Sequence, residues 1–304
     1  MHKYFTQLMR QNPSRFGTML ACLGVLVLTP DTLVIRLSGL ERWSLMGLRG
    51  ILMGAMTLLI WRLFLTRDPA REWRSLFSWP GLIVIISFSM NSASFTLGIV
   101  ETSATVVLTA LATMPVFAAI MSFLMLGERQ DWLGWLAIFA AMAGVVVVAM
   151  DGGNAIGSPP GSVILGAGFG VITAMGLALT FTMARKYPAL GILPAAAIGA
   201  MISGCIGLYL SDFNSLTSAP LWSVLTMGLV ILPLSFTCLT LAPRYASAAI
   251  VSLLMLLEMV IGPFWVWLGV GERPTLVMIA GAGFVTLVLG FHIIRTQWMA
   301  NPNE

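Results

Sequence analysis

The sequence predicts an all-α integral membrane protein whose ten transmembrane helices form two inverted repeats of five helices each. Three observations lead to this expectation. The chain is 58% hydrophobic and only 9% charged, which is too apolar to cover a soluble globule with polar surface. It contains ten apolar segments of membrane-spanning length. Several short motifs also recur at one constant spacing, and such recurrence indicates an internal duplication.

The apolar segments are each close to the ~20 residues that cross a hydrocarbon core about 30 Å thick. They run approximately over 17–36, 44–63, 80–100, 103–125, 132–150, 162–184, 190–210, 221–241, 246–268 and 275–294. The residues before the first segment are largely polar, and the segment itself carries Asp31 and Arg36. A cleavable signal peptide has an uninterrupted apolar region, so we expect none here.

The duplication is most visible in two Gly-Glu-Arg triplets, Gly127-Glu128-Arg129 and Gly271-Glu272-Arg273, which lie 144 residues apart. The same offset relates further pairs: Gly17 and Gly161, Gly24 and Gly168, Thr29 and Thr173, Thr96-Leu97 and Thr240-Leu241, Ser103-Ala104 and Ser247-Ala248. We therefore expect two five-helix repeats, residues 17–150 and 161–294, joined by a linker of residues 151–160. Residues 1–16 and 295–304 are expected to form the two tails.

The positions of the basic residues predict the orientation. With a cytoplasmic N-terminus, twelve basic residues fall on the cytoplasmic side: Lys3, Arg10, Arg15, Arg62, Arg67, Arg71, Arg74, Arg129, Arg185, Lys186, Arg244 and Arg295. Only Arg36, Arg42 and Arg273 fall outside. This bias predicts a multi-pass protein of the bacterial inner membrane with both termini in the cytoplasm. Because each half has an odd number of segments, the second half must insert upside down relative to the first.

Four polar residues are predicted to lie at one depth in the membrane. Counted at ~1.5 Å per residue from the cytoplasmic ends, Asp31, Asn91 and Glu258 lie roughly 18–21 Å deep. Arg49, counted from the opposite side, reaches nearly the same level. An ionisable group at this depth costs on the order of 2.5–3.5 kcal/mol, so each is a functional candidate. Inverted-repeat carriers bind their substrates near the same midplane.

Two interpretations of these residues stay open. Asp31 can serve only to neutralise Arg49 on the neighbouring helix, or both can bind a ligand. Glu258 has no basic residue at its level on its own helix, which makes it a candidate to bind a cationic group or to carry a proton. At the 144-residue offset the three ionisable residues correspond to Met or Leu, and only Asn91 corresponds to a polar residue, Ser235. That asymmetry is expected of recognition rather than of packing.

Other residues are assigned to the scaffold. Pro30, Pro115, Pro233 and Pro263 interrupt apolar segments and are candidates for helix kinks or gates. Glu128 and Glu272 lie at loop edges, where we expect them to tether loops or helix ends. Arg36 is expected to extend its side chain to the outer surface.

Several function classes are excluded by what the sequence lacks. It has no phosphate-binding loop, no cluster of His and Cys residues, and no nucleophile with a base and an acid. We therefore expect no ATP hydrolysis, no enzymatic activity, no cofactor and no metal, and no nucleic-acid partner.

Each half resembles the EamA module of the drug/metabolite transporter superfamily. In the first half, Ser103-Ala104 leads into 105–125, Gly-Glu-Arg and 131–150, and the second copy reads Ser247-Ala248, 249–270, Gly-Glu-Arg and 274–292. Arg49, in Gly47-Leu48-Arg49-Gly50, stands where the family commonly carries Arg. The resemblance implies a ten-helix inverted repeat that exports metabolites such as amino acids. The sequence departs from the family pattern at 28–32 and at 257–259, where a substrate would be expected.

The sequence thus predicts a secondary carrier working by alternating access, an exporter of small polar metabolites with amino and carboxylate groups. Amino acids and opine-like or nicotianamine-like metallophores fit this description. Arg49 would meet a carboxylate, Asp31 or Glu258 an amine, and Asn91 and Ser235 would add hydrogen bonds. Protons are the candidate coupling ion, and the protein is expected to be a monomer or homodimer in the lipid bilayer. Uptake or exchange of a vitamin, nucleoside or organic acid is the alternative, and an intramembrane enzyme or scaffold is the non-transport alternative.

Overall fold

The computed structural model describes residues 13–66, 68–127, 132–151, 156–157, 159–212, 220–246 and 248–300. These residues are almost entirely helical, and an isolated bridge between Ile156 and Arg273 is the one β-type pairing among them. By length and composition, seven helical spans in this part of the chain could cross a membrane: Arg15–Ser38, Arg42–Leu65, Trp79–Glu101, Ala104–Leu126, Val163–Lys186, Ile192–Leu210 and Leu221–Arg244. The protein is a multi-pass membrane protein.

The elements follow the expected segments closely. Those of residues 13–151 are α2 (Pro13–Leu28), α3 (Asp31–Ser38), α4 (Arg42–Ile60) with the π-helix η1 (Trp61–Leu65), α5 (Pro69–Ser75), α6 (Trp79–Glu101), α7 (Ala104–Leu111), α8 (Met114–Leu126) and α9 (Trp132–Asp151). The remainder are α10 (Val163–Lys186), α11 (Ile192–Leu210), α13 (Leu221–Leu225), the π-helix η3 (Thr226–Ile231), α14 (Leu232–Leu241), the 3₁₀-helix η4 (Ala242–Arg244), α15 (Ala248–Val270) and α16 (Leu276–Ala300).

The predicted prolines lie in different helical contexts. Pro30 separates α2 from α3, since it has no N–H and its ring clashes with the carbonyl four residues earlier. That carbonyl, on Leu26, instead accepts a hydrogen bond from Thr29 Oγ1 at 3.0 Å. Pro115 is the second residue of α8, just after the break that follows α7. Pro233 follows a π-helical turn at the start of α14, whereas Pro263 lies inside the continuous helix α15.

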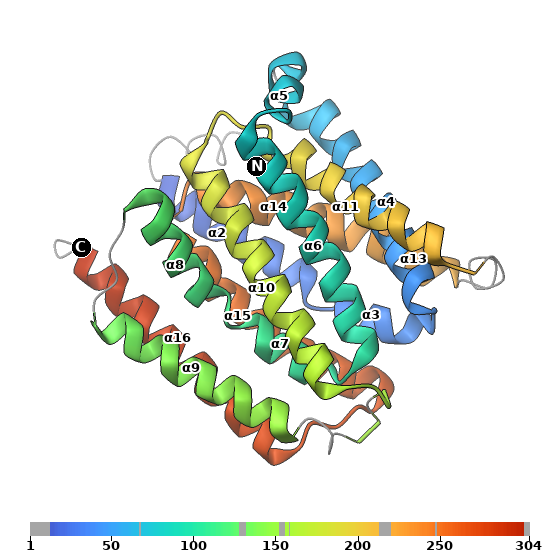
Figure 1. Ribbon diagram of the computed structural model, residues 1–304, viewed down its shortest axis with the longest axis vertical. Coiled ribbons are helices and arrows are strands. Elements are labelled where there is room, and N and C mark those ends of the chain that lie inside the picture. Colours follow the sequence, from blue (N-terminus) through green and yellow to red (C-terminus); the bar gives the residue numbers. More distant parts are fainter. Residues whose placement is uncertain are drawn as a thin grey trace.

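The helices pack mainly across the two halves of the chain. α4 packs on α11, α6 on α10, α2 on α14, and α9 on α16, and the last pair runs along the lower left of the molecule in Figure 1. Glycines permit the closest of these contacts. A Cβ atom placed on Gly50 of α4 would lie 2.5 Å from the carbonyl oxygen of Ala200 on α11. Small residues therefore fix the α4–α11 interface.

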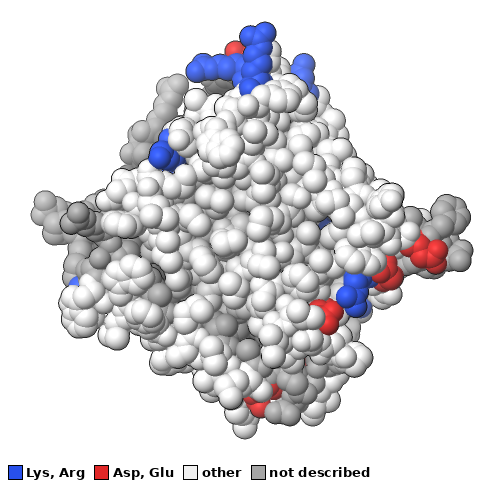
Figure 2. All heavy atoms as spheres, viewed as in Figure 1, with Lys and Arg blue, Asp and Glu red and all other residues white. Residues whose placement is uncertain are grey.

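The visible surface carries its charges at the ends of the bundle. Figure 2 shows a broad belt without charged side chains. Lys and Arg gather at the upper end, where Figure 1 places α5, and most of the acidic residues in view lie toward the right and lower edges. A belt of this kind is what a lipid-facing surface requires. The protein therefore contacts lipid along the sides of its helices.

Two expectations at the loop edges have different outcomes. The tethering role of Glu272 is confirmed, because its carboxylate accepts hydrogen bonds from Arg36 Nε at 3.0 Å and from the backbone N–H of Ala104 at 2.7 Å. The expected extension of Arg36 to the surface is wrong, because its side chain is only 11% exposed and turns inward to this carboxylate. Glu128, the repeat mate of Glu272, lies outside the described residues.

Candidate functional site

A cavity lies in the interior of the bundle, where helices of both halves converge. The centre of a water-sized sphere can occupy only about 20 Å³ of free space within it. α2, α4, α6, α7, α10, α14 and α15 contribute its walls, with Leu28, Arg49, Met53, Phe88, Asn91, Ser92, Phe95, Leu111, Thr173, Leu177, Leu232, Phe236, Met255 and Glu258. Most of these side chains are apolar, and the charged ones are Arg49 and Glu258. The cavity is therefore an apolar chamber with two opposite charges in its wall.

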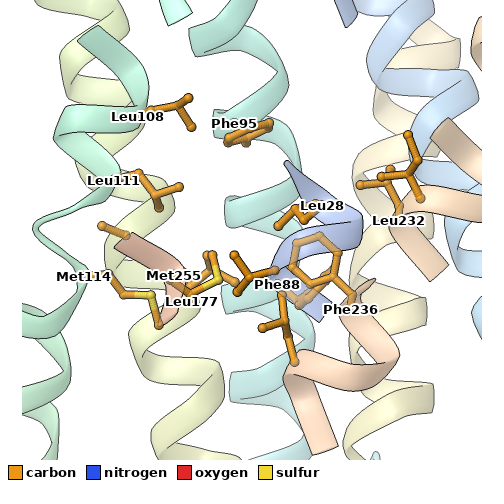
Figure 3. Close-up of a cluster of buried hydrophobic side chains, with 14 of the residues drawn as sticks. Leu28, Phe88, Phe95, Leu108, Leu111, Met114, Leu177, Leu232, Phe236 and Met255 are labelled. Carbon is orange, nitrogen blue, oxygen red and sulfur yellow. The ribbon is translucent and has the colours of Figure 1, made fainter. Parts of the chain in front are cut away.

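The apolar walls leave little free room. Figure 3 shows Leu28, Phe88 and Phe236 converging in the cluster of buried side chains. The rings of Phe88 and Phe236 meet edge to face, with their centroids 5.3 Å apart. The gaps between the side chains admit little more than single water molecules. A solute the size of an amino acid therefore requires these side chains to move apart.

Arg49 is held from three directions. Its Nη2 donates a charge-assisted hydrogen bond to Asp31 Oδ2. Its Nη1 donates to Thr96 Oγ1 at 2.8 Å, and Thr96 Oγ1 in turn donates to the carbonyl of Ser92 at 3.0 Å. The guanidinium also lies over the ring of Phe95, 5.0 Å from its centroid. Nε is left without a partner. The group is thus rigidly placed and has one unused donor.

Asp31 is fully buried at the start of α3 and does not line the cavity. Its Oδ2 binds Arg49, and its Oδ1 has no hydrogen-bond partner. The helix α3 begins at this residue because Pro30 interrupts the preceding helix. Asp31 therefore contacts the cavity only through Arg49.

Glu258 differs from Asp31 in facing the cavity. It lies midway along α15, is buried, and its Oε2 has no hydrogen-bond partner. The charges of Asp31 and Arg49 act on its carboxyl group. A buried carboxylate without a partner is costly. Glu258 is therefore placed to accept a hydrogen bond from a cationic group or a proton.

The two remaining expected residues are placed differently from each other. Asn91, on α6, is buried and lines the cavity. Ser235 is also buried, but its hydroxyl donates to the carbonyls of Ile231 at 2.6 Å and Leu232 at 3.2 Å in its own part of the chain. It is not among the residues that line the cavity. The structure thus joins Arg49, Asn91 and Glu258 at one chamber, with Asp31 behind Arg49.

Sequence reasoning missed Thr96 and Phe95, the two residues of α6 that hold Arg49. Thr96 has a repeat mate, Thr240, whose hydroxyl donates only to carbonyls of residues just before it in the chain. Thr96 makes the same kind of bond and, in addition, accepts from Arg49. Because apolar helices commonly carry such Thr residues, only the position of Arg49 distinguishes this one.

Outside the membrane-spanning segments, Glu272 is a buried loop acid whose pKa is shifted. Burial raises the pKa of its carboxyl group, while the Arg36 guanidinium and the Ala104 N–H oppose that rise. The residue lies between α15 and α16, at one end of the bundle.

An apolar helical bundle around a narrow chamber with two opposite charges is the architecture of a membrane carrier for small molecules. Residues 15–150 match the EamA-like transporter family. This first part of the chain belongs to the family, which lies within the drug/metabolite transporter superfamily. The protein is a membrane transporter and not an enzyme, and its partners are a small-molecule substrate and the surrounding lipid.

A solved structure supports the fold over nearly the whole chain. A structure titled "Crystal structure of protein" superposes with a TM-score of 0.68 at 12% identity, covering 93% of this chain and 98% of that one. At this identity the likeness concerns the fold alone. No curated protein sequence matches the chain.

Proposed function

We propose that the protein is a secondary carrier that exports small metabolites bearing an amino and a carboxylate group across the bacterial inner membrane by alternating access. The observation that carries this proposal is the pair of unused polar atoms at the cavity, Arg49 Nε and Glu258 Oε2. A carboxylate can accept from Arg49, and an ammonium group can donate to Glu258. Asp31 then orients Arg49, and Asn91 adds a hydrogen bond to the ligand.

The apolar walls favour one of the two expected substrate types. Besides Arg49 and Glu258, the cavity wall has few polar groups, the side chains of Asn91, Ser92 and Thr173. A metallophore with several carboxylates would leave most of them unpaired in apolar surroundings. An amino acid with an apolar side chain places one carboxylate, one ammonium group and one apolar group. The cavity therefore supports amino-acid-like solutes over opine-like or nicotianamine-like ones.

Two features support the inverted repeat that alternating access uses. At the 144-residue offset, α2 corresponds to α10 and α6 to α14, so the α2–α14 contact has its equivalent in the α10–α6 contact. The α4–α11 and α9–α16 contacts each join two equivalent helices. In addition, Gly127 and Gly271 both adopt the left-handed conformation, with φ of 73° and 74°. Gly127 directly follows α8, and Gly271 directly follows α15. Equivalent caps and equivalent contacts are expected of a pseudo-two-fold arrangement of two five-helix units, ten transmembrane helices in all.

The distribution of charge supports the proposed orientation. The basic α5 lies at the end of the bundle opposite the Glu272 loop, and the visible Lys and Arg side chains gather at the α5 end. On the positive-inside rule α5 and both termini lie in the cytoplasm and the Glu272 end faces outward. A reporter fused after Asp151 should be active outside, and one fused after Ser75 should be active only in the cytoplasm. A cytoplasmic signal after Asp151 would contradict the ten-helix arrangement.

Transport can be tested by counterflow in proteoliposomes that hold the purified protein. A panel of amino acids should include, for each exchanged solute, its decarboxylated amine and its deaminated acid. Each truncated analogue should compete at least about tenfold more weakly, because one charge-assisted hydrogen bond of roughly 1.5–3 kcal/mol is lost.

The panel also separates the proposal from its alternatives. Vitamins, nucleosides and organic acids are added as candidate solutes, and flux is measured in both directions. Equal competition by the amine and the parent amino acid would show that Arg49 does not bind a carboxylate. Exchange confined to solutes without an amino group would contradict the proposed substrate class.

A further inference from the structure

A cluster of buried polar contacts at the Glu272 end closes the bundle beyond the cavity. Glu272 Oε2 accepts from Arg36 Nε at 3.0 Å, and its Oε1 accepts from the backbone N–H of Ala104 at 2.7 Å. Arg36 Nη2 donates to the carbonyl of Thr102 at 2.5 Å. The cluster therefore joins the end of α3, the connection before α7 and the loop between α15 and α16.

The helix α3 links this cluster directly to the cavity. It is eight residues long and is separated from α2 at Pro30. Its first residue, Asp31, binds Arg49, and Arg36 lies five residues later, about 7.5 Å along the helix. Between these levels, a Cβ atom placed on Gly269 of α15 would lie 2.2 Å from Leu33, so α3 also packs tightly on α15. A shift of α3 at the cavity must therefore move Arg36.

The chemistry of the cluster suits a contact that opens. The Glu272 side chain is 3% exposed and that of Arg36 is 11% exposed, so closing this end removes both charges from water. Such burial is expensive, and apolar side chains would make a permanent contact without that cost. When the end opens, both groups regain water, which offsets much of the lost ion pair. An ion pair of this kind is therefore suited to exchange between a closed and an open arrangement.

The ion pair of this cluster is not repeated at the equivalent position of the second half. The repeat mate of Arg36 is Thr180, whose hydroxyl donates to the carbonyl of Gly176 and bonds to Ser87 Oγ. Thr180 cannot form an ion pair. Among the described residues, Arg36 therefore forms an ion pair that its repeat mate at position 180 cannot reproduce.

We propose that the Arg36–Glu272 pair is a latch that holds the cavity closed at the outer end and releases when α3 moves in response to an occupied site. The latch rests on the proposed transport function and adds to it. A carrier whose outer end is latched when empty is loaded from the cytoplasm, which is the order of events in an exporter.

The latch is tested by the access of a thiol reagent to the cavity. A Ser92→Cys reporter on the cavity wall is made in a background in which Cys22, Cys205 and Cys238 are replaced by Ser. A membrane-impermeant maleimide is added to right-side-out vesicles without substrate. Glu272→Gln and Arg36→Gln should each raise the labelling rate at least about tenfold. Glu272→Gln is the more informative variant, because the amide oxygen can still accept from Ala104.

The control is the neighbouring pair of Arg42 and Glu101, joined at 3.3 Å with Arg42 48% exposed. Because exposed pairs contribute little, Arg42→Gln should change labelling by less than about twofold. Parental labelling rates in folded Glu272→Gln and Arg36→Gln would overturn the latch. Labelling needs no transport, so failure of the counterflow panel would leave this result standing.

A second variant covers the case in which the single substitutions do not fold. Arg36→Cys and Glu272→Cys are made together in the background without Cys22, Cys205 and Cys238; a short reducible cross-linker between them should stop transport, and reduction should restore it. Undiminished transport by the cross-linked protein would overturn the latch.

Discussion

Replacing Asp31 and Arg49 singly and together separates the structural role of this pair from ligand recognition. Removing one partner of a buried ion pair costs about 3–5 kcal/mol, because the other charge is left uncompensated. The two single variants should not cost the same. A lone Asp31 carboxylate can take up a proton, whereas a lone Arg49 cannot lose one. Asp31→Asn should therefore fall at the upper end of this range and Arg49→Leu at the lower end.

The double variant Asp31→Asn/Arg49→Leu leaves no unpaired charge, so its loss of stability should be well below the sum of the two single losses. What remains lost is the hydrogen bond from the charged Arg49 to Thr96, about 1.5–3 kcal/mol, and the contact with the ring of Phe95, about 0.5–1 kcal/mol. The free energy of unfolding of the double variant should thus be about 2–4 kcal/mol below that of the parent. Arg42→Leu, at an exposed pair, is the control and should be close to neutral.

Stability is measured by denaturant titration in detergent micelles and transport by counterflow in proteoliposomes. Because Arg49 lines the cavity and Asp31 does not, the double variant should be folded and still inactive. Recovery of both stability and transport would show that the pair is only structural. A double variant less stable than either single variant would refute the charge-compensation argument itself.

Three further predictions concern other residues. Glu258→Gln keeps the shape of the side chain and removes its charge. This variant should insert normally but transport at least about tenfold more slowly, the effect of ~1.4 kcal/mol. Parental transport rates from about pH 5.5 to about pH 8 would rule out proton coupling at this residue. Thr96→Val should raise the half-saturating substrate concentration several-fold, because Arg49 loses a hydrogen-bond acceptor. Thr96→Ser keeps the hydroxyl and should have the parental value. Equal values for the two variants would show that the hydroxyl does not position Arg49. Gly50→Ala should destabilise the protein by about 1–3 kcal/mol through the α4–α11 contact, whereas Gly168→Ala, where an added Cβ meets nothing within 4 Å, should be neutral or stabilising in thermal unfolding.

Seven of the ten expected segments are membrane-spanning candidates in the described structure, and they could be predicted because length and hydropathy determine them directly. The Asp31–Arg49 pair could also be anticipated, since two opposite charges at one depth on neighbouring helices are stable only near each other. Pro30 marked the break between α2 and α3. In each case the deciding physics is local or depends on depth alone, which a linear sequence records.

Contacts between distant segments could not be predicted in the same way. Arg36 binds Glu272, which lies 236 positions away, and a residue near a membrane surface has water as an equally plausible partner. Ser235 was expected at the site from its pairing with Asn91, but its hydroxyl bonds to nearby backbone carbonyls. Which side of a helix faces a cavity depends on rotation about the helix axis. The almost uniformly apolar sequence does not encode that rotation.

The close spacing of Asp31 and Arg49 has a consequence for how the protein is made. The two residues belong to consecutive membrane segments and lie 18 positions apart. The hairpin formed by α2–α3 and α4 can therefore enter the bilayer with its charges already neutralised, before the ribosome has translated α10 or α14. Glu258 follows more than two hundred residues later, when most of the chamber that surrounds it already exists. The order of translation thus matches the order in which each buried charge finds its surroundings.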